Sequence, residues 1–170
     1  IKGDYVTFVD SDDFVCEYFL EKLYHSMSIN NSDISSGNFC NFDEQKKVFQ
    51  FFTTEDTFFE KVYTPEQFIK LDNVSESNLF LVFVFVTGKL YKRYLWKELR
   101  FPPGKLREDY AIVHKLYLQA KSISFFNEAI YFRGIHSSNI SHKEMLEDIE
   151  GMIKNSEERI ALMASMGYDT

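Results

Sequence analysis

The chain has 170 residues, of which 45% are hydrophobic and 17% aromatic, so a single domain can bury a core rich in rings. Its formal net charge of −7 argues against nucleic acid as a partner, because the polyphosphate backbone attracts basic proteins. No apolar run approaches the about 18 residues of a membrane-spanning helix.

An acidic cluster, Asp10-Ser11-Asp12-Asp13, follows the first predicted strand. Residues 5–9 are β-branched and aromatic and come after the turn signal Gly3-Asp4, which is typical of a strand. Beyond the cluster, apolar residues at spacings of three and four predict a helix over residues 16–27. The expected order is therefore strand, acidic loop and helix.

The middle of the chain predicts a hairpin, a short helix and a buried strand. Residues 32–42 and 47–53 form two extended segments on either side of a polar turn. Thr64-Pro65-Glu66-Gln67 combines a capping hydroxyl, a proline at the first helical position and a Gln at the third, which predicts a helix start. The longest apolar run, residues 79–86, is interpreted as a buried strand.

A third helix is expected after an irregular loop. The loop contains Phe101-Pro102-Pro103-Gly104, which stops regular structure. The helix is predicted over residues 108–120, with Glu108 and Asp109 in its first turn. Carboxylates are electrostatically favoured at that end of a helix, so the pair has a structural explanation as well as any functional one.

The last part of the chain predicts two strands and a long helix. Residues 122–126 and 129–133 are the two short strands. Ser141-His142-Lys143-Glu144 is a second capping box, and an apolar stripe at helical spacing continues from it. We therefore divide the chain into residues 1–141 and a C-terminal amphipathic helix, 142–170, that packs on the first part or on a partner.

The acidic cluster has two interpretations. Three carboxylates within four residues repel one another, and a bound cation would hold them together. Carboxylate oxygens suit Mg²⁺ or Mn²⁺, and ligands of open α/β sheets gather at the carboxyl ends of strands. Alternatively, Ser11, Asp12 or Asp13 only caps the helix that follows.

Four blocks of the chain carry a family resemblance. The blocks are Gly3 to Asp13; Gly88-Lys89-Leu90-Tyr91-Lys92-Arg93; Phe101-Pro102-Pro103-Gly104-Lys105 with Glu108-Asp109; and Ile130-Tyr131-Phe132-Arg133 with Asn139-Ile140-Ser141. In content and order they resemble blocks of family 2 glycosyltransferases of the GT-A type, in which the first ends in a DxD motif. A lone DxD is weak evidence, whereas four ordered blocks are hard to obtain by chance.

The resemblance implies an α/β fold, a partial GT-A (Rossmann-like nucleotide-diphospho-sugar transferase) domain. Its N-terminal nucleotide-binding half would precede Ile1, so we expect this fragment to be inactive alone. The implied reaction is the metal-dependent, inverting transfer of a sugar from a nucleoside-diphosphate sugar to a hydroxyl of a glycan, lipid-linked or protein acceptor. Such enzymes act in bacterial cell-surface glycan synthesis and use Mn²⁺ or Mg²⁺.

The resemblance also assigns roles to the acids. Asp12, the second acid of DxD, would ligate the metal that bridges the diphosphate, and Asp10 would lie near the ribose or the metal's waters. Asp13 is a weaker candidate for the same site. Asp109 of the Glu108-Asp109 pair would be the general base on the acceptor hydroxyl, because a sugar hydroxyl is a poor nucleophile until its proton is accepted.

Four further residues are weaker candidates. Arg133 and His136 lie in the block where family members place residues that reach the diphosphate or the metal, and a guanidinium can pair with phosphate oxygens. Lys89 and Trp96, like Glu108 and Asp13, would contact the acceptor or lie behind the site. A lone histidine or single aromatic ring is more often an ordinary core or surface residue, so these assignments compete with structural explanations.

Two other functions remain open. Magnesium-dependent phosphoryl transfer of the haloacid-dehalogenase type also uses an Asp-x-Asp after a strand, but Phe14 stands where that pattern has Thr or Val. A non-catalytic fragment could instead dock a partner, or a second copy, through the C-terminal helix. Cys16 and Cys40 form no CxxC pair and indicate free thiols, so we expect a cytoplasmic protein, soluble or peripheral at the inner face of the membrane.

Overall fold

The computed structural model describes residues 2–51, 58–71, 80–104, 108–135 and 146–168. In this part of the chain the strands are β1 (Tyr5–Val6), β2 (Phe14–Val15), β3 (Ile34–Asp43), β4 (Val48–Phe51), β5 (Glu60–Tyr63), β6 (Lys89–Lys92) and β7 (Ile123–Ile135). The helices are α1 (Phe19–Ile29), α2 (Pro65–Lys70), α3 (Phe80–Val84), the 3-10 helix η2 (Arg93–Trp96), α4 (Glu108–Gln119) and α5 (Leu146–Ser165).

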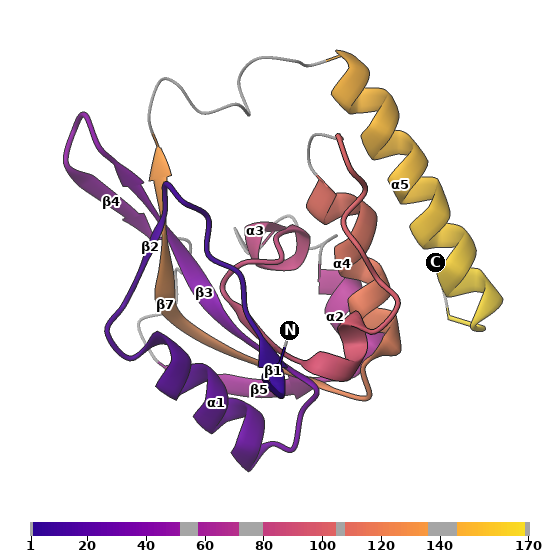
Figure 1. Cartoon of the computed structure of the whole chain (residues 1–170), viewed down its shortest axis with the longest axis horizontal. Coiled ribbons are helices and arrows are strands. Elements are labelled where there is room, and N and C mark those ends of the chain that lie inside the picture. Colours follow the sequence, from indigo (N-terminus) through magenta and orange to yellow (C-terminus); the bar gives the residue numbers. More distant parts are fainter. Residues whose placement is uncertain (1, 52–57, 72–79, 105–107, 136–145, 169–170) are drawn as a thin grey trace.

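A curled mixed sheet organises these elements (Figure 1). Its order is β1-β6-β3-β7-β2, with β4 paired to β3 and β5 to β7. The long strands β3 and β7 run parallel through its centre, and the other pairs are antiparallel. Both edges carry a very short strand, and these two strands flank the acidic cluster in sequence.

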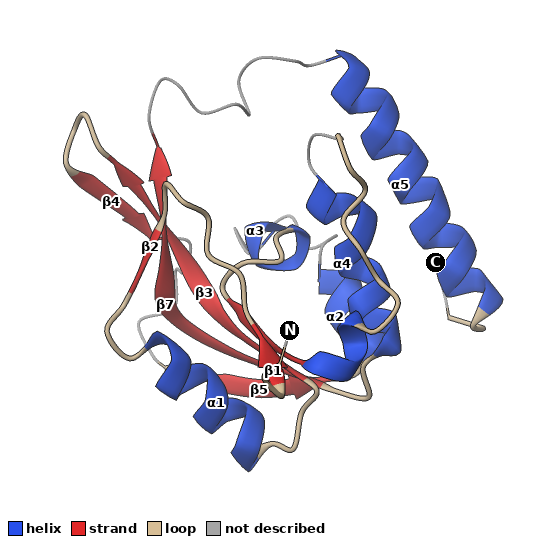
Figure 2. Ribbon diagram, in the orientation of Figure 1, coloured by secondary structure: helices blue, strands red, loops and turns tan. Residues whose placement is uncertain are grey.

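Helices lie on both sides of the sheet (Figure 2). The helix α1 lies on one side, whereas α2, α3 and α4 lie on the other, and α5 runs beside α4 as the outermost element. Leu23 of α1, Phe39 of β3 and Leu116 of α4 are fully buried in one continuous apolar core. Rings account for much of that core: Phe68 packs edge-on against Phe83 and Tyr117, as the aromatic content predicted.

Several predictions from local signals are confirmed. The hairpin exists as β3 and β4, although β4 ends at Phe51. The capping box at the start of α2 is complete, because the Gln67 backbone N–H donates to the Thr64 hydroxyl and the Gln67 side chain accepts from the Thr64 N–H. The predicted helix that begins at Glu108 is α4. These signals depend on residues within one turn of each other.

The predicted strand over residues 79–86 is wrong, because its described part contains the helix α3 followed by a bend and no strand. A short apolar run has no period that separates a buried strand from a buried helix. Two boundaries also differ. The strand expected over residues 5–9 is paired only at Tyr5 and Val6, and Val9 is 48% exposed. The two strands expected around residue 127 are one strand, β7, with an irregular register there.

The C-terminal helix α5 packs along α4. Met163 is buried, and Glu158 pairs with Lys115 of α4 at 2.9 Å. After the helix, Gly167 adopts a φ of +77° and the Tyr168 N–H donates to the Met163 carbonyl, a glycine-terminated helix end. The second capping box and the 141/142 boundary lie outside the described residues. No helix in the described ranges is long and apolar enough to cross a membrane.

Candidate active site

The acidic cluster forms a tight turn between β1 and β2. The Asp13 N–H donates to the Asp10 carbonyl at 3.2 Å, and Asp10, Ser11 and Asp12 are exposed. The alternative that this cluster caps the next helix is wrong: β2 intervenes, and α1 begins after Tyr18 without a side-chain cap. The acids are therefore held at this place by something other than helix capping.

Tyr131 of β7 holds the turn in place. Its hydroxyl donates to Asp13 Oδ2 at 2.7 Å and accepts from the Asp10 N–H at 3.0 Å. The Gly134 N–H donates to Asp13 Oδ1 at 2.9 Å, so both carboxylate oxygens of Asp13 are used in fixing the turn to β7. This arrangement gives Asp13 a structural task and leaves Asp10 and Asp12 as the exposed carboxylates of the turn.

The turn and β7 approach each other closely at Gly134. A Cβ atom at Gly134 would lie 2.6 Å from the Asp12 carbonyl oxygen, which is closer than real Cβ contacts allow. Glycine is therefore required by space here rather than by a positive φ. The close approach brings the main chain of β7 directly beneath the acidic turn.

Negative charge accumulates at the turn. Asp10 touches solvent, yet partial desolvation raises its pKa, and the neighbouring carboxylates of Asp13, Asp12 and Glu108 raise it further. Desolvation also raises the pKa of Asp13, although the Tyr131 and Gly134 donors oppose the rise.

Asp109 lies in the first turn of α4, where its Oδ2 accepts the Val86 N–H at 3.0 Å. Burial raises the pKa of Asp109 to about 6; Val86 opposes that shift, and the carboxylates of Glu108 and Asp10 add to it. A carboxylate with a raised pKa near neutrality is suited to accepting a proton. The effect of the Asp10 charge on Asp109 indicates that the fold brings together two acids almost a hundred positions apart.

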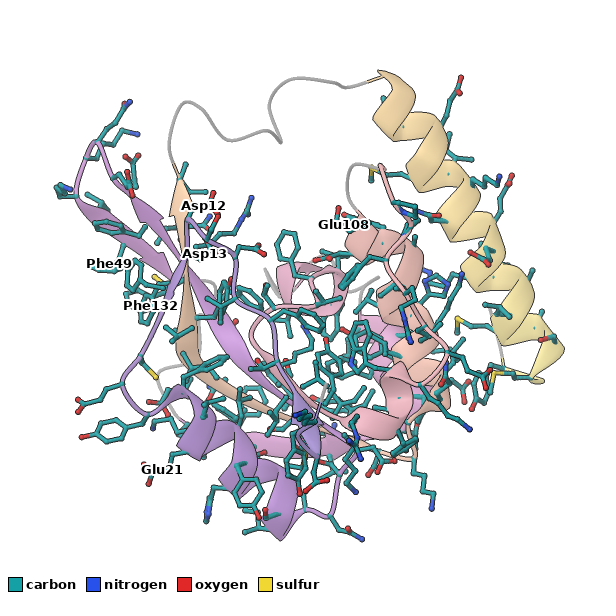
Figure 3. All side chains as sticks on the ribbon, in the orientation of Figure 1. Asp12, Asp13, Glu21, Phe49, Glu108 and Phe132 are labelled. Carbon is teal, nitrogen blue, oxygen red and sulfur yellow. The ribbon has the colours of Figure 1, made fainter. Side chains whose placement is uncertain are left out.

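Arg133 faces the same region from β7. Its guanidinium lies over the Phe85 ring, 5.0 Å from the centroid, and its positive charge lowers the pKa values of Asp10 and Asp13. Figure 3 shows Asp12 and Asp13 on the sheet side and Glu108 at the start of α4, with α3 between them in the view. The candidate site is thus built from the acidic turn, β7 and the start of α4.

The other predicted site residues have different positions. Lys89 is fully buried and donates to two backbone carbonyls, so it does not reach a ligand directly and occupies a supporting position behind the site. Trp96 is buried among rings, 4.8 Å from the Phe8 centroid and 5.5 Å from that of Phe101, which favours packing over contact with an acceptor. His136 lies outside the described residues.

No three His, Cys, Asp or Glu side chains in the described ranges are grouped so that they alone could hold a metal ion. The charge at the turn nevertheless fits a divalent cation that takes one or two carboxylates and completes its shell with water and phosphate oxygens. Asp10 and Asp12 are the exposed acids that could supply those carboxylates.

The sequence reasoning missed Tyr131 and the Val86 N–H. Tyr131 lies in the Ile130-Tyr131-Phe132-Arg133 block, and strand alternation places it on the same face as Arg133. That alternation was available as a signal. Nothing in the sequence predicted the hydrogen bond from Val86 to Asp109, because the donor is a backbone N–H, which every residue type except proline has.

Comparisons with known proteins agree with this fold. No protein family model matches the chain. The chain is 34% identical to glycosyltransferase GlyA of Streptococcus pneumoniae over 99% of its own length and 24% of that protein. It is 32% identical to glycosyltransferase GlyG of the same organism, over 84% of this chain and 48% of that protein. The chain therefore spans between a quarter and a half of these relatives.

The fold is shared with Staphylococcus aureus TarS. TarS 1-349 in complex with UDP-GlcNAc matches 93% of this chain and 43% of its own chain, with a TM-score of 0.66 at 22% identity. TarS 1-349 without that ligand gives a TM-score of 0.58 over 79% of this chain. Cys16 and Cys40 are both free thiols, as expected. The chain thus has the fold of part of a GT-A glycosyltransferase, and its sequence relatives are bacterial glycosyltransferases.

Proposed function

We propose that the protein containing this chain transfers a sugar from a nucleoside-diphosphate sugar to a hydroxyl acceptor during cell-surface glycan synthesis. The observation that carries the proposal is the meeting of the acidic turn, Arg133 and the half-buried Asp109 at one place. The relatives named glycosyltransferases support the reaction class. Family 2 membership and an inverting course, which the sequence resemblance implies, are part of this proposal.

Asp109 is the proposed general base. The acceptor oxygen forms a bond to the anomeric carbon, the bond from that carbon to the phosphate oxygen breaks, and the acceptor proton passes to an Asp109 carboxylate oxygen. A pKa of about 6 leaves Asp109 largely ionised at neutral pH while keeping it basic enough to accept the proton. One in-line displacement of this kind inverts the anomeric configuration.

The leaving diphosphate requires positive charge. Asp12 and Asp10 are the proposed ligands of Mn²⁺ or Mg²⁺, which would neutralise the diphosphate as it departs. Arg133 adds a fixed guanidinium, held over the Phe85 ring, that can pair with phosphate oxygens. Glu108 lies in the same helical turn as Asp109 and adds negative charge near Asp10, so it favours retention of the cation.

The donor and acceptor are proposed at different levels of detail. UDP-GlcNAc is the first donor to test, since TarS has been solved in complex with it. The acceptor is a glycan, lipid-linked or protein hydroxyl.

We place the reaction in the cytoplasm or at the inner face of the membrane, in keeping with two unpaired cysteines. The comparisons favour this reaction over phosphoryl transfer, because the relatives are named for glycosyl transfer.

Metal-dependent donor binding in the full-length protein tests the proposal. We expect wild-type protein to bind UDP more tightly with Mn²⁺ than with a chelator and to release UDP from UDP-GlcNAc. Asp12→Ala should abolish the Mn²⁺-dependent part of binding. Glu21→Gln is the matched control, because Glu21 is an exposed acid on α1, away from Asp12 in Figure 3. Equal Mn²⁺ dependence in wild type and the Asp12 variant would reject the metal assignment.

A further inference from the structure

The main chain at the end of α3 and just after it accepts hydrogen bonds from several side chains. The carbonyl of Phe83 accepts the Tyr117 hydroxyl at 2.9 Å, and that of Val86 accepts the Tyr91 hydroxyl at 2.9 Å. The carbonyls of Phe85 and Thr87 both accept from Lys89 Nζ, at 2.6 and 3.3 Å. This turn, residues 85–87, therefore keeps its shape through side chains rather than through a backbone ladder.

Lys89 is an unusual residue for this task. Its side chain is fully buried, and none of the ion pairs in the described residues involves it. Its ammonium nitrogen lies 5.6 Å from the Phe39 centroid. Burial lowers the pKa of Lys89 to about 7, but even the neutral amine has two N–H donors for its two carbonyls. The Asp109 carboxylate opposes the fall in the pKa of Lys89 without forming an ion pair with it. A buried lysine without a direct ion pair is costly, which indicates a specific use.

The turn that Lys89 holds contacts both halves of the candidate site. The Val86 N–H donates to Asp109 Oδ2 at 3.0 Å, and the Phe85 ring lies beneath the Arg133 guanidinium. The carbonyl of Lys89 itself accepts the Thr7 hydroxyl at 2.6 Å, in the segment that leads to the acidic turn. Lys89 is therefore hydrogen-bonded to the segments that support Asp109, Arg133 and the acidic turn.

We propose that Lys89 is a positioning residue for the transfer reaction: it fixes the turn at residues 85–87 so that the Val86 N–H orients the Asp109 carboxylate and the Phe85 ring supports Arg133. This inference rests on the proposed function. Gly88 lies between this turn and Lys89. It has a φ of +67°, and a Cβ there would lie 2.7 Å from the Phe39 ring, so the main chain beside Lys89 is constrained as well. Lys89 acts through the turn and touches neither donor nor acceptor.

Substitution of Lys89 in the full-length enzyme tests the inference. Lys89→Met should lower kcat for UDP release from UDP-GlcNAc on the order of 10²-fold, the cost of misplacing a catalytic group by about 1 Å, while KM changes by less than about threefold. Lys89→Gln retains an amide donor and should lose less. Lys92→Met is the matched control: it removes a lysine from the same strand, with its 2.9 Å bond to Asp33, and should keep wild-type kcat.

A second readout does not require turnover. The Val86 backbone amide resonance in ¹H–¹⁵N spectra should shift as Asp109 ionises near pH 6 in wild type and in Lys92→Met. It should lose that response in Lys89→Met and, as a reference, in Asp109→Asn. A retained response in a folded Lys89→Met protein would overturn the inference.

The outcomes separate this inference from the proposed function. Wild-type kcat in a folded Lys89→Met or Lys89→Gln protein, with Asp109→Asn inactive, contradicts positioning by Lys89 and leaves the glycosyltransferase assignment intact. Absence of donor turnover by wild type with UDP-GlcNAc and other nucleotide sugars defeats the assignment itself. If Lys89→Met does not fold, the Gln variant decides: kcat below that of Lys92→Met supports positioning, and equal kcat contradicts it.

Discussion

Removal of the Tyr131 hydroxyl isolates the bond that ties the acidic turn to β7. In Tyr131→Phe, Asp13 Oδ2 loses a donor at 2.7 Å and the Asp10 N–H loses its acceptor at 3.0 Å. The ring itself remains, packed 5.1 Å from the Phe39 centroid, so no cavity is created. The substitution therefore reports on hydrogen bonds alone.

The expected loss follows from the two bonds. A hydrogen bond to a charged carboxylate contributes about 1.5–3 kcal/mol and a neutral one about 0.5–1.5 kcal/mol. Because Asp13 is only half-buried, we expect the lower part of the sum, about 2–3 kcal/mol in the free energy of unfolding, or roughly 5–10 °C in Tm.

The loss should depend on pH. The Tyr131 donor lowers the pKa of Asp13 by favouring its ionised form, so the folded variant binds a proton at a higher pH than folded wild type. The difference in stability is therefore complete where Asp13 is ionised and shrinks as pH falls through its pKa.

Denaturant unfolding at about pH 8 and about pH 4.5 measures this dependence. Tyr117→Phe is the control, since its hydroxyl donates to the neutral Phe83 carbonyl and its loss should be the same at both values. Equal losses at both pH values in Tyr131→Phe, or no loss at all, would refute the reasoning.

Three further predictions concern the same fold. Transfer measured as kcat/KM should rise with pH through about 6, because Asp109 must be ionised, and a flat profile there would contradict the base assignment. Gly134→Ala should destabilise the fold by about 1–3 kcal/mol, because the new Cβ would clash with the Asp12 carbonyl. Gly151→Ala in the helix α5 meets no atom within 4 Å and should stabilise the fold by about 0.5–1 kcal/mol. Thermal melts measure the Tm of both variants. If α5 mediates self-association, Ile153→Lys should convert an oligomer to a monomer in light scattering, because Ile153 is 54% exposed, and a wild-type monomer would contradict the oligomer prediction.

The parts of the fold that the sequence predicted are those with local causes. The capping box at Thr64 and the acidic first turn at Glu108 define helix starts within four residues, and both helices are present. The helix α3 was not predictable in this way, because every side chain of its run is apolar and the packing of Val82 and Phe83 in the core decides its conformation.

The site was predicted in its residue types but not in its connections. Asp10, Asp12 and Asp109 came from carboxylate chemistry and family resemblance. The proximity of Asp10 to Asp109 depends on the pairing of β1 with β6 and on the position of α4. The burial of Lys89 runs against the usual exposure of lysine, so no pattern predicts it. Contacts between segments that are distant in the sequence determine how these residues are arranged, and the sequence pattern does not contain that information.

The carboxylate of Asp109 also links stability to function. Its pKa in the folded protein, about 6, exceeds the ordinary value of 3.8. Ionisation of Asp109 is therefore less favourable in the folded state, and the protein loses stability as pH rises from 3.8 through 6. Asp109→Asn should therefore raise the free energy of unfolding at about pH 8, by up to about 3 kcal/mol, and not at about pH 3.5. Such a gain would mark a group retained for chemistry rather than for the fold.

Single-turnover transfer by Asp109→Asn in the full-length enzyme tests the central claim most directly. With UDP-GlcNAc or the donor that wild type uses, and with Mn²⁺ present, we predict donor binding close to that of wild type and a transfer rate lower by about 10²- to 10⁴-fold, the usual contribution of a general base. Wild-type transfer by a folded Asp109→Asn protein would contradict the assignment of Asp109 as the base.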